Sequence, residues 1–249
     1  MDRNKFSAIA HQHHAYSNPI SEEKLMKVVQ MTALKPQAKV IDIGAGKCEL
    51  LIQLVEKYQV NATAIELYAG AIEEAKKNAS NKIPEGSIDY IVDDAASAIE
   101  ICEQAGYDVG ICIGSTHALG GLETTLEKLK GLVKKNGYIL IGEGYWNQTP
   151  SPAYLEALGG ADESELKIHA ENVHVAEQLG LIPLWAYTAS EDDWDEYEWL
   201  YSSSIENYCL ENPDDPDCEA MLERIRAWRR TYLNWGRDTM GFGLYLFRN

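Results

Sequence analysis

Short apolar runs alternate along the chain with longer segments in which apolar residues recur every three or four positions, from about residue 37 to residue 143. Runs of the first kind predict buried strands, and the longer period predicts amphipathic helices. The predicted strands are 38–43, 61–65, 88–92, 107–113 and 138–143, and the predicted helices between them are 49–58, 69–78 and 122–134. This alternation is typical of βαβ units, so it predicts an α/β fold built on a parallel sheet.

The pattern changes after residue 143. Pro150 and Pro152 interrupt it, because proline cannot continue a strand or a helix interior. A helix over 163–178 and strands over 181–188 and 241–247 are expected next. The segment between those two strands, 191–239, is acidic at its start, rich in Trp and Tyr, and helical in its spacing. It therefore predicts a helical insertion.

A helix is also expected near the N-terminus. Ser21 precedes Glu22 and Glu23, and carboxylates favour the positive end of a helix dipole. Ahead of it stand His11, His13 and His14, which resemble a metal cluster but lack partner carboxylates at ligand spacing. We therefore expect no metal site, and we interpret this segment as solvated or as part of a pocket lid.

Composition and charge narrow the class of protein. A chain of 249 residues accommodates one α/β domain with an added segment. The net charge of −17, from 39 acidic and 22 basic side chains, repels phosphate backbones, so we expect no nucleic acid partner. Arg224, Arg226, Arg229 and Arg230 form the one basic cluster, interpreted as a solvated helix face or as intramolecular pairs because Glu219 and Glu223 share the helix.

The absence of a recognisable targeting signal and the spacing of the cysteines favour a cytoplasmic protein. The first residues lack an apolar run that could act as a signal, and no later stretch approaches the length of a membrane span. The five cysteines include no Cys-x-x-Cys pair, which favours reduced thiols, although Cys209 and Cys218 could bridge a loop. We expect no membrane partner.

A glycine turn ends the first predicted strand. Its residues are Asp42-Ile43-Gly44-Ala45-Gly46, and Glu66 closes the second strand about 20 positions later. Glycines let the backbone approach a ligand closely, and the following helix presents free N–H groups. A carboxylate at the tip of the second strand can accept hydrogen bonds from both ribose hydroxyls. Together these residues predict a nucleoside-containing ligand.

Two nucleoside cofactors compete for this turn. The dinucleotide fingerprint requires a glycine three positions after Gly46, where this chain has Glu49, a carboxylate that would face a pyrophosphate. Asp42 instead suits the ammonium group of a methionine moiety, either directly or through water, although it could also cap the glycine turn. The turn therefore favours S-adenosylmethionine over a nicotinamide dinucleotide.

The third strand is followed by Asp93 and Asp94. Either carboxylate could accept a hydrogen bond from an adenine amino group, and we favour Asp94 over Asp93 because small residues follow it. The alternative is that an aspartate here caps the helix that begins at Ala95.

Candidate catalytic residues follow the fourth and fifth strands. His117 lies in the segment 114–121 and could accept a proton from an acceptor, or it could be a structural histidine bonded to a loop carbonyl. Glu143 is the second candidate base. Tyr145 and Trp146 come next and could wall an acceptor pocket or belong to the core.

The assembled motifs resemble a known family. They are Asn18-Pro19 with Glu22-Glu23-Lys24, Asp42-Ile43-Gly44-Ala45-Gly46, Asp94-Ala95-Ala96, Gly114-Ser115-Thr116, Gly120-Gly121, and Leu140-Ile141-Gly142-Glu143 before Tyr145-Trp146. In this order they resemble the class I S-adenosylmethionine-dependent methyltransferases, over roughly 35–143 and the final two strands. The likeness is greatest to the YjhP-like group of small bacterial methyltransferases.

The resemblance implies a Rossmann-like sheet of seven strands, mostly parallel and with the last strand antiparallel. It also implies a helical lid over 1–34, a cofactor-binding core over 35–190 with 240–249, and a helical substrate cap over 191–239. Many members carry a third glycine where this chain has Cys48.

The residues expected at the site fall into three groups. The cofactor-binding set is Asp42, Gly44, Ala45, Gly46, Glu66, Leu67, Asp94, Ala95 and Gly114. The substrate-pocket set is Tyr16, Asn18, His117, Tyr145 and Trp146, and the catalytic set is His117 and Glu143.

We therefore expect an enzyme, a monomer or homodimer, that passes a methyl group in line from S-adenosylmethionine to a small-molecule acceptor and leaves S-adenosylhomocysteine. One alternative is a protein that binds these two compounds without methyl transfer. Another is a nicotinamide-linked oxidoreductase.

Overall fold

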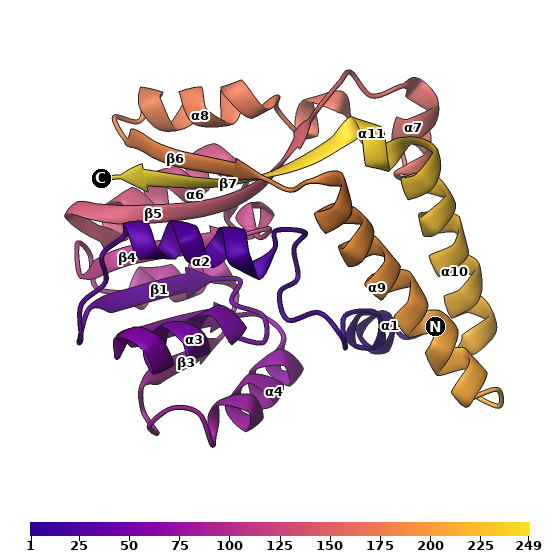
Figure 1. The fold of residues 1–249 in the computed structure, drawn as a ribbon, viewed down its shortest axis with the longest axis horizontal. Coiled ribbons are helices and arrows are strands. Elements are labelled where there is room, and N and C mark those ends of the chain that lie inside the picture. Colours follow the sequence, from indigo (N-terminus) through magenta and orange to yellow (C-terminus); the bar gives the residue numbers. More distant parts are fainter.

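A single seven-stranded sheet forms the centre of the computed structural model, which describes residues 1–249 (Figure 1). The strands are β1 Lys39–Ile43, β2 Asn61–Glu66, β3 Ile88–Val92, β4 Tyr107–Ile113, β5 Val133–Trp146, β6 Ile182–Thr188 and β7 Met240–Arg248. Their order is β3-β2-β1-β4-β5-β7-β6, and β7 runs antiparallel to both of its neighbours. The predicted α/β class and antiparallel last strand are confirmed.

Helices cover both faces of the sheet. On one face lie α2 Glu22–Met31, α3 Glu49–Tyr58 and α4 Ala69–Ala79, and on the other lie α5 Ala95–Ala98, α6 Leu122–Leu132 and α8 His169–Gln178. Successive strand residues point to opposite faces, so Val40 joins the first apolar cluster and Ile41 joins the second. The apolar runs found in the sequence are buried on both sides for this reason.

The helical insertion forms a hairpin beside the sheet. It consists of α9 Glu191–Glu211 and α10 Cys218–Thr231, followed by a π-helical turn at Tyr232–Gly236 and by α11 Arg237–Thr239. Helix α1, Arg3–Ala10, packs on this hairpin through Phe6 and Ala10 (Figure 1). Residues 1–34 therefore contribute one helix to the hairpin and one, α2, to the sheet, and the lid role of this segment stays a prediction.

Two expected element boundaries are wrong. The helix predicted over 163–178 begins only at His169, and Glu163–Glu165 form a short 3-10 turn. Glu165 accepts a hydrogen bond from the Asp162 N–H and Glu171 accepts one from the Ile168 N–H, so the segment contains two helix starts in place of one. Between these starts, the Lys167 carbonyl accepts a hydrogen bond from the Trp146 N–H and holds the chain extended.

Strand β5 begins at Val133, earlier than the predicted start at residue 138. Val133 pairs with Tyr107 and Tyr138 pairs with Val109, so residues 135–137, which separate the predicted helix from the predicted strand, form an irregularity inside β5. Asn136 adopts a positive φ of 64° there, and its N–H donates to the Asn249 carbonyl at 2.7 Å. The start of β5 therefore depends on a contact with the far end of the chain.

Other helices are short. They are α7 Pro152–Ala157, which follows β5, and the 3-10 turns Ile99–Ile101 and Thr116–Leu119. All five cysteines are free. None of the helices has the length and apolar character that crossing a membrane requires.

Candidate functional site

A cavity of about 150 Å³ lies at the carboxyl ends of β1 and β4. The strand ends contribute Asp42, Gly44, Ala45, Gly46 and Gly114 to its wall, and the N-terminal segment contributes Ala15, Tyr16, Ser17 and Asn18. Ligands bind at this edge of open α/β sheets. The structure thus brings five of the predicted cofactor residues and two of the predicted pocket residues around one space.

The glycine loop of this cavity has a conformation that glycine favours. Gly44 has a φ of +75°, and a Cβ at this position would lie 2.3 Å from the Ser115 hydroxyl oxygen. The N–H groups of Gly44 and Ala45 donate to the Ile65 carbonyl at 2.9 and 3.0 Å. The loop is therefore held against β2 on one side and against the segment after β4 on the other.

Cys48 takes up a glycine-like backbone conformation at the start of α3. Its φ of 56° and ψ of 21° lie in the left-handed region, and its side chain is buried. A side chain in this region strains the backbone, whereas glycine would adopt the same conformation without strain.

Asp42 is a buried carboxylate on the cavity wall with 6% of its surface exposed. Burial and the nearby charge of Glu66 raise the pKa of Asp42 to about 7. No hydrogen bond joins its side chain to the glycine turn, so the alternative capping role is not observed. An ammonium group in the cavity would supply the missing partner and favour the ionised form.

Glu66 fastens the glycine loop to β2. Its Oε2 accepts a hydrogen bond from the Gly46 N–H and its Oε1 accepts one from the Tyr68 N–H, both at 2.9 Å. A carboxylate offers about four lone-pair positions, so both oxygens can still accept from ligand hydroxyls. Leu67, the next residue, is 71% exposed at the same strand end.

Asp94 caps α5, as the alternative interpretation expected. Its Oδ1 accepts hydrogen bonds from the N–H groups of Ala96 and Ser97 at 3.0 and 3.3 Å. Its Oδ2 accepts none and is free to meet a ligand, so capping and ligand binding are compatible in this residue. Asp94 and Ala95 follow β3 and lie outside the cavity at β1 and β4.

Glu143 is held at the end of β5 by two donors. The Thr116 hydroxyl donates to its Oε2, and the Gly144 N–H donates to its Oε1 at 3.1 Å. Burial raises the pKa of Glu143, while these two hydrogen bonds and the nearby His117 oppose the rise. His117 is exposed in the 3-10 turn beside it. The two candidate bases therefore lie near each other. Sequence reasoning missed Thr116, which orients Glu143.

Tyr145 and Trp146 are buried in packing contacts. The Tyr145 ring lies 5.2 Å from the His169 ring, and the Trp146 indole N–H donates to the Glu163 carbonyl at 2.8 Å. Neither residue lines a cavity described here, so their place in an acceptor pocket stays a prediction.

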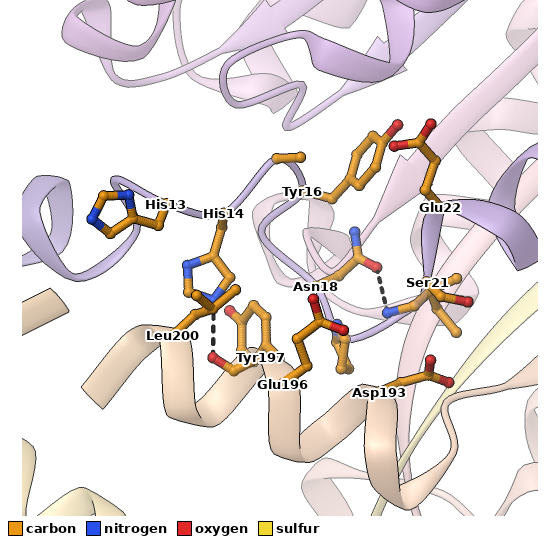
Figure 2. Close-up of a pocket in the computed structure, with 13 residues that line it drawn as sticks. His13, His14, Tyr16, Asn18, Ser21, Glu22, Asp193, Glu196, Tyr197 and Leu200 are labelled. Atoms are coloured by element: carbon orange, nitrogen blue, oxygen red, sulfur yellow. Dashed lines mark hydrogen bonds between the residues drawn. The ribbon is translucent and has the colours of Figure 1, made fainter. Parts of the chain in front are cut away.

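A second cavity, of about 240 Å³, lies between the N-terminal segment and α9 (Figure 2). Tyr16 and Asn18 line this cavity as well as the first, so they form a shared wall. Helix α9 contributes Asp193, Glu196 and Tyr197. The lining includes carboxylates and no lysine or arginine, and the spacing along the chain gave no signal that α9 would meet the N-terminus here.

His14 joins the N-terminal segment to α9. Its Nε2 lies 2.9 Å from the Tyr197 carbonyl, and its ring lies 4.5 Å from the Tyr197 ring (Figure 2). His13 lines the same cavity. No group of histidine, cysteine or carboxylate side chains in the structure is arranged to hold a metal ion.

Two lysines hold the walls of these cavities together. The Lys47 ammonium donates to the His11 carbonyl at 3.1 Å and pairs with Glu74 at 3.0 Å. Lys24, from α2, pairs with Asp193 of α9 and donates to the Thr188 carbonyl at 2.9 Å. The N-terminal segment and α9 are thereby fixed over the strand ends.

Comparisons with known proteins agree with this geometry. A family model described as "Methyltransferase domain" matches residues 34–201. YjhP from Escherichia coli is 26% identical over 248 residues, which cover 98% of each chain. A S-adenosylmethionine-dependent methyltransferase from Geobacter sulfurreducens, solved with S-adenosylhomocysteine, is 25% identical with a TM-score of 0.88, over 98% of this chain and 97% of that chain.

A more distant structure shares the fold alone. It is phosphoethanolamine N-methyltransferase 2 from Haemonchus contortus, solved with phosphomonomethylethanolamine and S-adenosylhomocysteine, and it is 14% identical with a TM-score of 0.74. The match covers 98% of this chain and 57% of that chain.

Proposed function

This chain belongs to the methyltransferase domain family and is an S-adenosylmethionine-dependent methyltransferase, and we propose that its acceptor is a small molecule. We propose further that this acceptor binds between the N-terminal segment and α9. The predicted family, enzyme class and cofactor are confirmed, and S-adenosylhomocysteine is the product that follows from them. The acceptor and the residue roles below belong to the proposal.

The observation that carries the proposal is the shared wall of the two cavities. Tyr16 and Asn18 separate a space of about 150 Å³ at the glycine loop from one of about 240 Å³ at α9. Both spaces are smaller than the roughly 300–1,000 Å³ of typical ligand pockets, so they suit a small molecule better than a polymer segment. The structure of the same fold from Haemonchus contortus holds a small phosphorylated amine. The residues 1–34 and 191–239 would then act as lid and substrate cap.

Each cofactor residue has a proposed partner. Asp42 would bind the ammonium group, Glu66 the two ribose hydroxyls, and Asp94 with Ala95 and Leu67 the adenine. The backbone of Gly44, Ala45, Gly46 and Gly114 would allow the ligand to approach closely. The free Oδ2 of Asp94 and the unpaired carboxylate of Asp42 support this assignment.

The protein's main tasks are alignment and the exclusion of water. S-adenosylmethionine supplies a methyl group on a sulfonium, which leaves as a neutral thioether, so little activation is required. His117 or Glu143 would accept a proton from an acceptor that arrives protonated. The exposure of His117 favours it for this role, because Glu143 is half-buried.

A release assay tests the proposal. The purified protein is incubated with S-adenosylmethionine and a panel of thiols, amines, phenols and carboxylates, and S-adenosylhomocysteine is measured. Turnover with a small acceptor supports the proposal. Calorimetry on the same protein separates the alternatives: binding without turnover on the whole panel favours a non-catalytic binding protein, and the absence of binding overturns the site assignment. A rise in melting temperature with NADH alone would favour the oxidoreductase.

A further inference from the structure

The helical hairpin contains a third cavity, of about 470 Å³, that the proposed function does not use. It lies between α1, α7, α9 and α10. None of its lining residues belongs to the cofactor cavity, and it shares only Tyr197 with the proposed acceptor cavity. Its volume falls within the range of small-molecule sites.

Glu198 is a buried carboxylate on the wall of this cavity that lacks a cationic partner. It is 6% exposed, and its Oε2 accepts a hydrogen bond from the Trp228 indole N–H at 2.6 Å. No lysine, arginine or histidine forms an ion pair with it, and burial raises its pKa to about 7. A buried carboxylate costs free energy unless it is paired. Glu198 is thus a buried carboxyl group whose ionised form has no counter-charge in the structure.

Aromatic side chains surround this carboxylate. Phe6, Tyr197, Tyr201 and Trp228 line the cavity from three helices. The faces of such rings attract cations, and groups of them form the recognition sites of organic ammonium ions. An ammonium group is therefore the partner that both Glu198 and its surroundings favour.

Arg224 lines the same cavity and carries the opposite unpaired charge. Its guanidinium lies 4.8 Å from the centre of the Phe6 ring and forms no ion pair. Of the other arginines of the insertion, Arg226, Arg229 and Arg237 pair with carboxylates, whereas Arg230, exposed like Arg224, does not. A simple cation in the cavity would be repelled by Arg224, whereas a ligand that also carries an anionic group would bind it.

We propose that this cavity binds a small zwitterion, with its ammonium group against Glu198 and the aromatic rings and its anionic group on Arg224. This would be a small-molecule site in addition to the proposed cofactor and acceptor sites. It does not depend on the identity of the methyl acceptor.

Calorimetry with two quaternary probes tests the ammonium half of the site. Glycine betaine and phosphocholine carry a carboxylate and a phosphate respectively, and neither nitrogen can accept a methyl group, so binding is separated from turnover. At least one should bind, and the comparison identifies the preferred anion. The carbon isostere of betaine, 3,3-dimethylbutanoate, should bind about tenfold more weakly because it lacks the positive charge. Equal binding of betaine and this isostere, or binding of neither zwitterion, would overturn the proposal.

Two substitutions test the assigned contacts. Glu198→Gln should weaken binding of the zwitterion about tenfold or more, and Arg224→Gln should weaken the zwitterion while leaving choline, which has no anionic group, unchanged or tighter. Arg230→Gln, on the same helix but outside the cavity, is the matched control and should change neither. Zwitterion binding that survives Glu198→Gln would refute the assignment.

Folding is checked independently. S-adenosylhomocysteine affinity should be the same in all of these variants, and Glu198→Gln should not lower the melting temperature because it removes a buried charge. Loss of zwitterion binding with intact cofactor binding therefore reports on this cavity alone, and a failure of the proposed methyl transfer would leave the result unaffected.

Discussion

The sheet and the helical hairpin are held together by different forces. The two faces of the sheet bury clusters of 24 and 21 apolar residues, whereas the hairpin and α1 share a cluster of 7. The hairpin relies on ion pairs instead, such as Lys5 with Asp215 at 2.6 Å and Arg237 with Asp195 at 3.1 Å. Ion pairs that stay partly open to solvent, as these do, contribute about 1 kcal/mol or less each, far less than buried apolar side chains.

This difference predicts which substitutions should change cofactor binding and which should change the binding of the other ligands. The proposed cofactor contacts come from residues at strand ends, which the sheet holds rigid. A substitution of one of these residues should therefore affect S-adenosylhomocysteine binding. The walls of the proposed acceptor and zwitterion cavities include α9 and α10, which polar contacts hold in place. A substitution there should change the binding of the acceptor or the zwitterion and leave cofactor binding unchanged. The following substitutions test that separation.

The largest effect is expected at the proposed base. His117→Ala should lower turnover about 100-fold or more, the usual contribution of a positioned acid or base. Cofactor affinity should remain the same because His117 lies outside the cavity at the glycine loop. Steady-state kinetics and calorimetry measure the two quantities. A parallel loss of cofactor binding would refute the separation, and full activity would exclude His117 as the base.

The next effect concerns the buried charge of the hairpin. Burial raises the pKa of Glu198 from 4.5 to about 7, so the folded protein favours the protonated form. Folding is therefore favoured below the unfolded pKa, and this contribution is lost as the pH rises through about 4.5 to 7, by about 3 kcal/mol at most. Glu198→Gln should remove this dependence.

Urea unfolding of both proteins at several pH values measures the effect. His11 also contributes in this interval, because burial lowers its pKa from 6.5 to about 4, but its contribution is common to wild type and Glu198→Gln and cancels in their difference. Burial raises the pKa of Tyr154 and of Tyr197, so neither titrates here. Glu196→Gln, exposed on the same helix, serves as the control. A difference between wild type and Glu198→Gln that is constant with pH would contradict the expectation.

A smaller effect is expected at the glycine loop. Glu66→Gln should weaken S-adenosylhomocysteine binding about tenfold, since hydrogen bonds to a charged group contribute about 1.5 kcal/mol or more. The amide oxygen can still accept from the Gly46 N–H, but the amide NH2 group then faces the Tyr68 N–H, so the free energy of unfolding should also fall by about 1 kcal/mol. Glu73→Gln, exposed on α4, is the control in the same titration. Undiminished affinity would remove Glu66 from the cofactor site.

The contact between α9 and α11 should give a still smaller effect. Arg237 pairs with Asp195, which also accepts a hydrogen bond from the Tyr232 hydroxyl at 2.6 Å. Arg237→Met should lower the free energy of unfolding by about 1 kcal/mol and raise the acceptor KM, with cofactor affinity unchanged. Arg230→Met provides the comparison. A fall in cofactor affinity would show that hairpin and sheet are coupled.

The smallest effect is expected at Cys48. Cys48→Gly relieves a left-handed backbone but increases the freedom of the unfolded chain, so the free energy of unfolding should change by less than about 1 kcal/mol. Cys48→Val should destabilise more, because a β-branched side chain fits this conformation poorly. Thermal unfolding compares the two. Equal stability of both variants would show that the backbone here is unstrained.

Much of the sheet could be predicted because its signals are local. The apolar runs and the glycine turn at Gly44 depend only on neighbouring residues, and strands of this kind are buried wherever they pair. The predicted bounds were wrong where contacts with residues far away in the chain determine the local structure. Asn249 holds the turn at Asn136 inside β5, and Lys167 interrupts the helix expected over 163–178 by accepting a hydrogen bond from Trp146.

The sequence by itself determined the α/β class, the family and the strand-end residues that line the cavity at the glycine loop, because periodicity and motif spacing are properties of short segments. Only the tertiary structure decided that α9 meets the N-terminal segment, that Thr116 holds Glu143, and that Glu198 is buried without a cation. These contacts join residues far apart in the chain. Burial and pairing of charge depend on what the folded chain brings around a side chain, which no local pattern specifies.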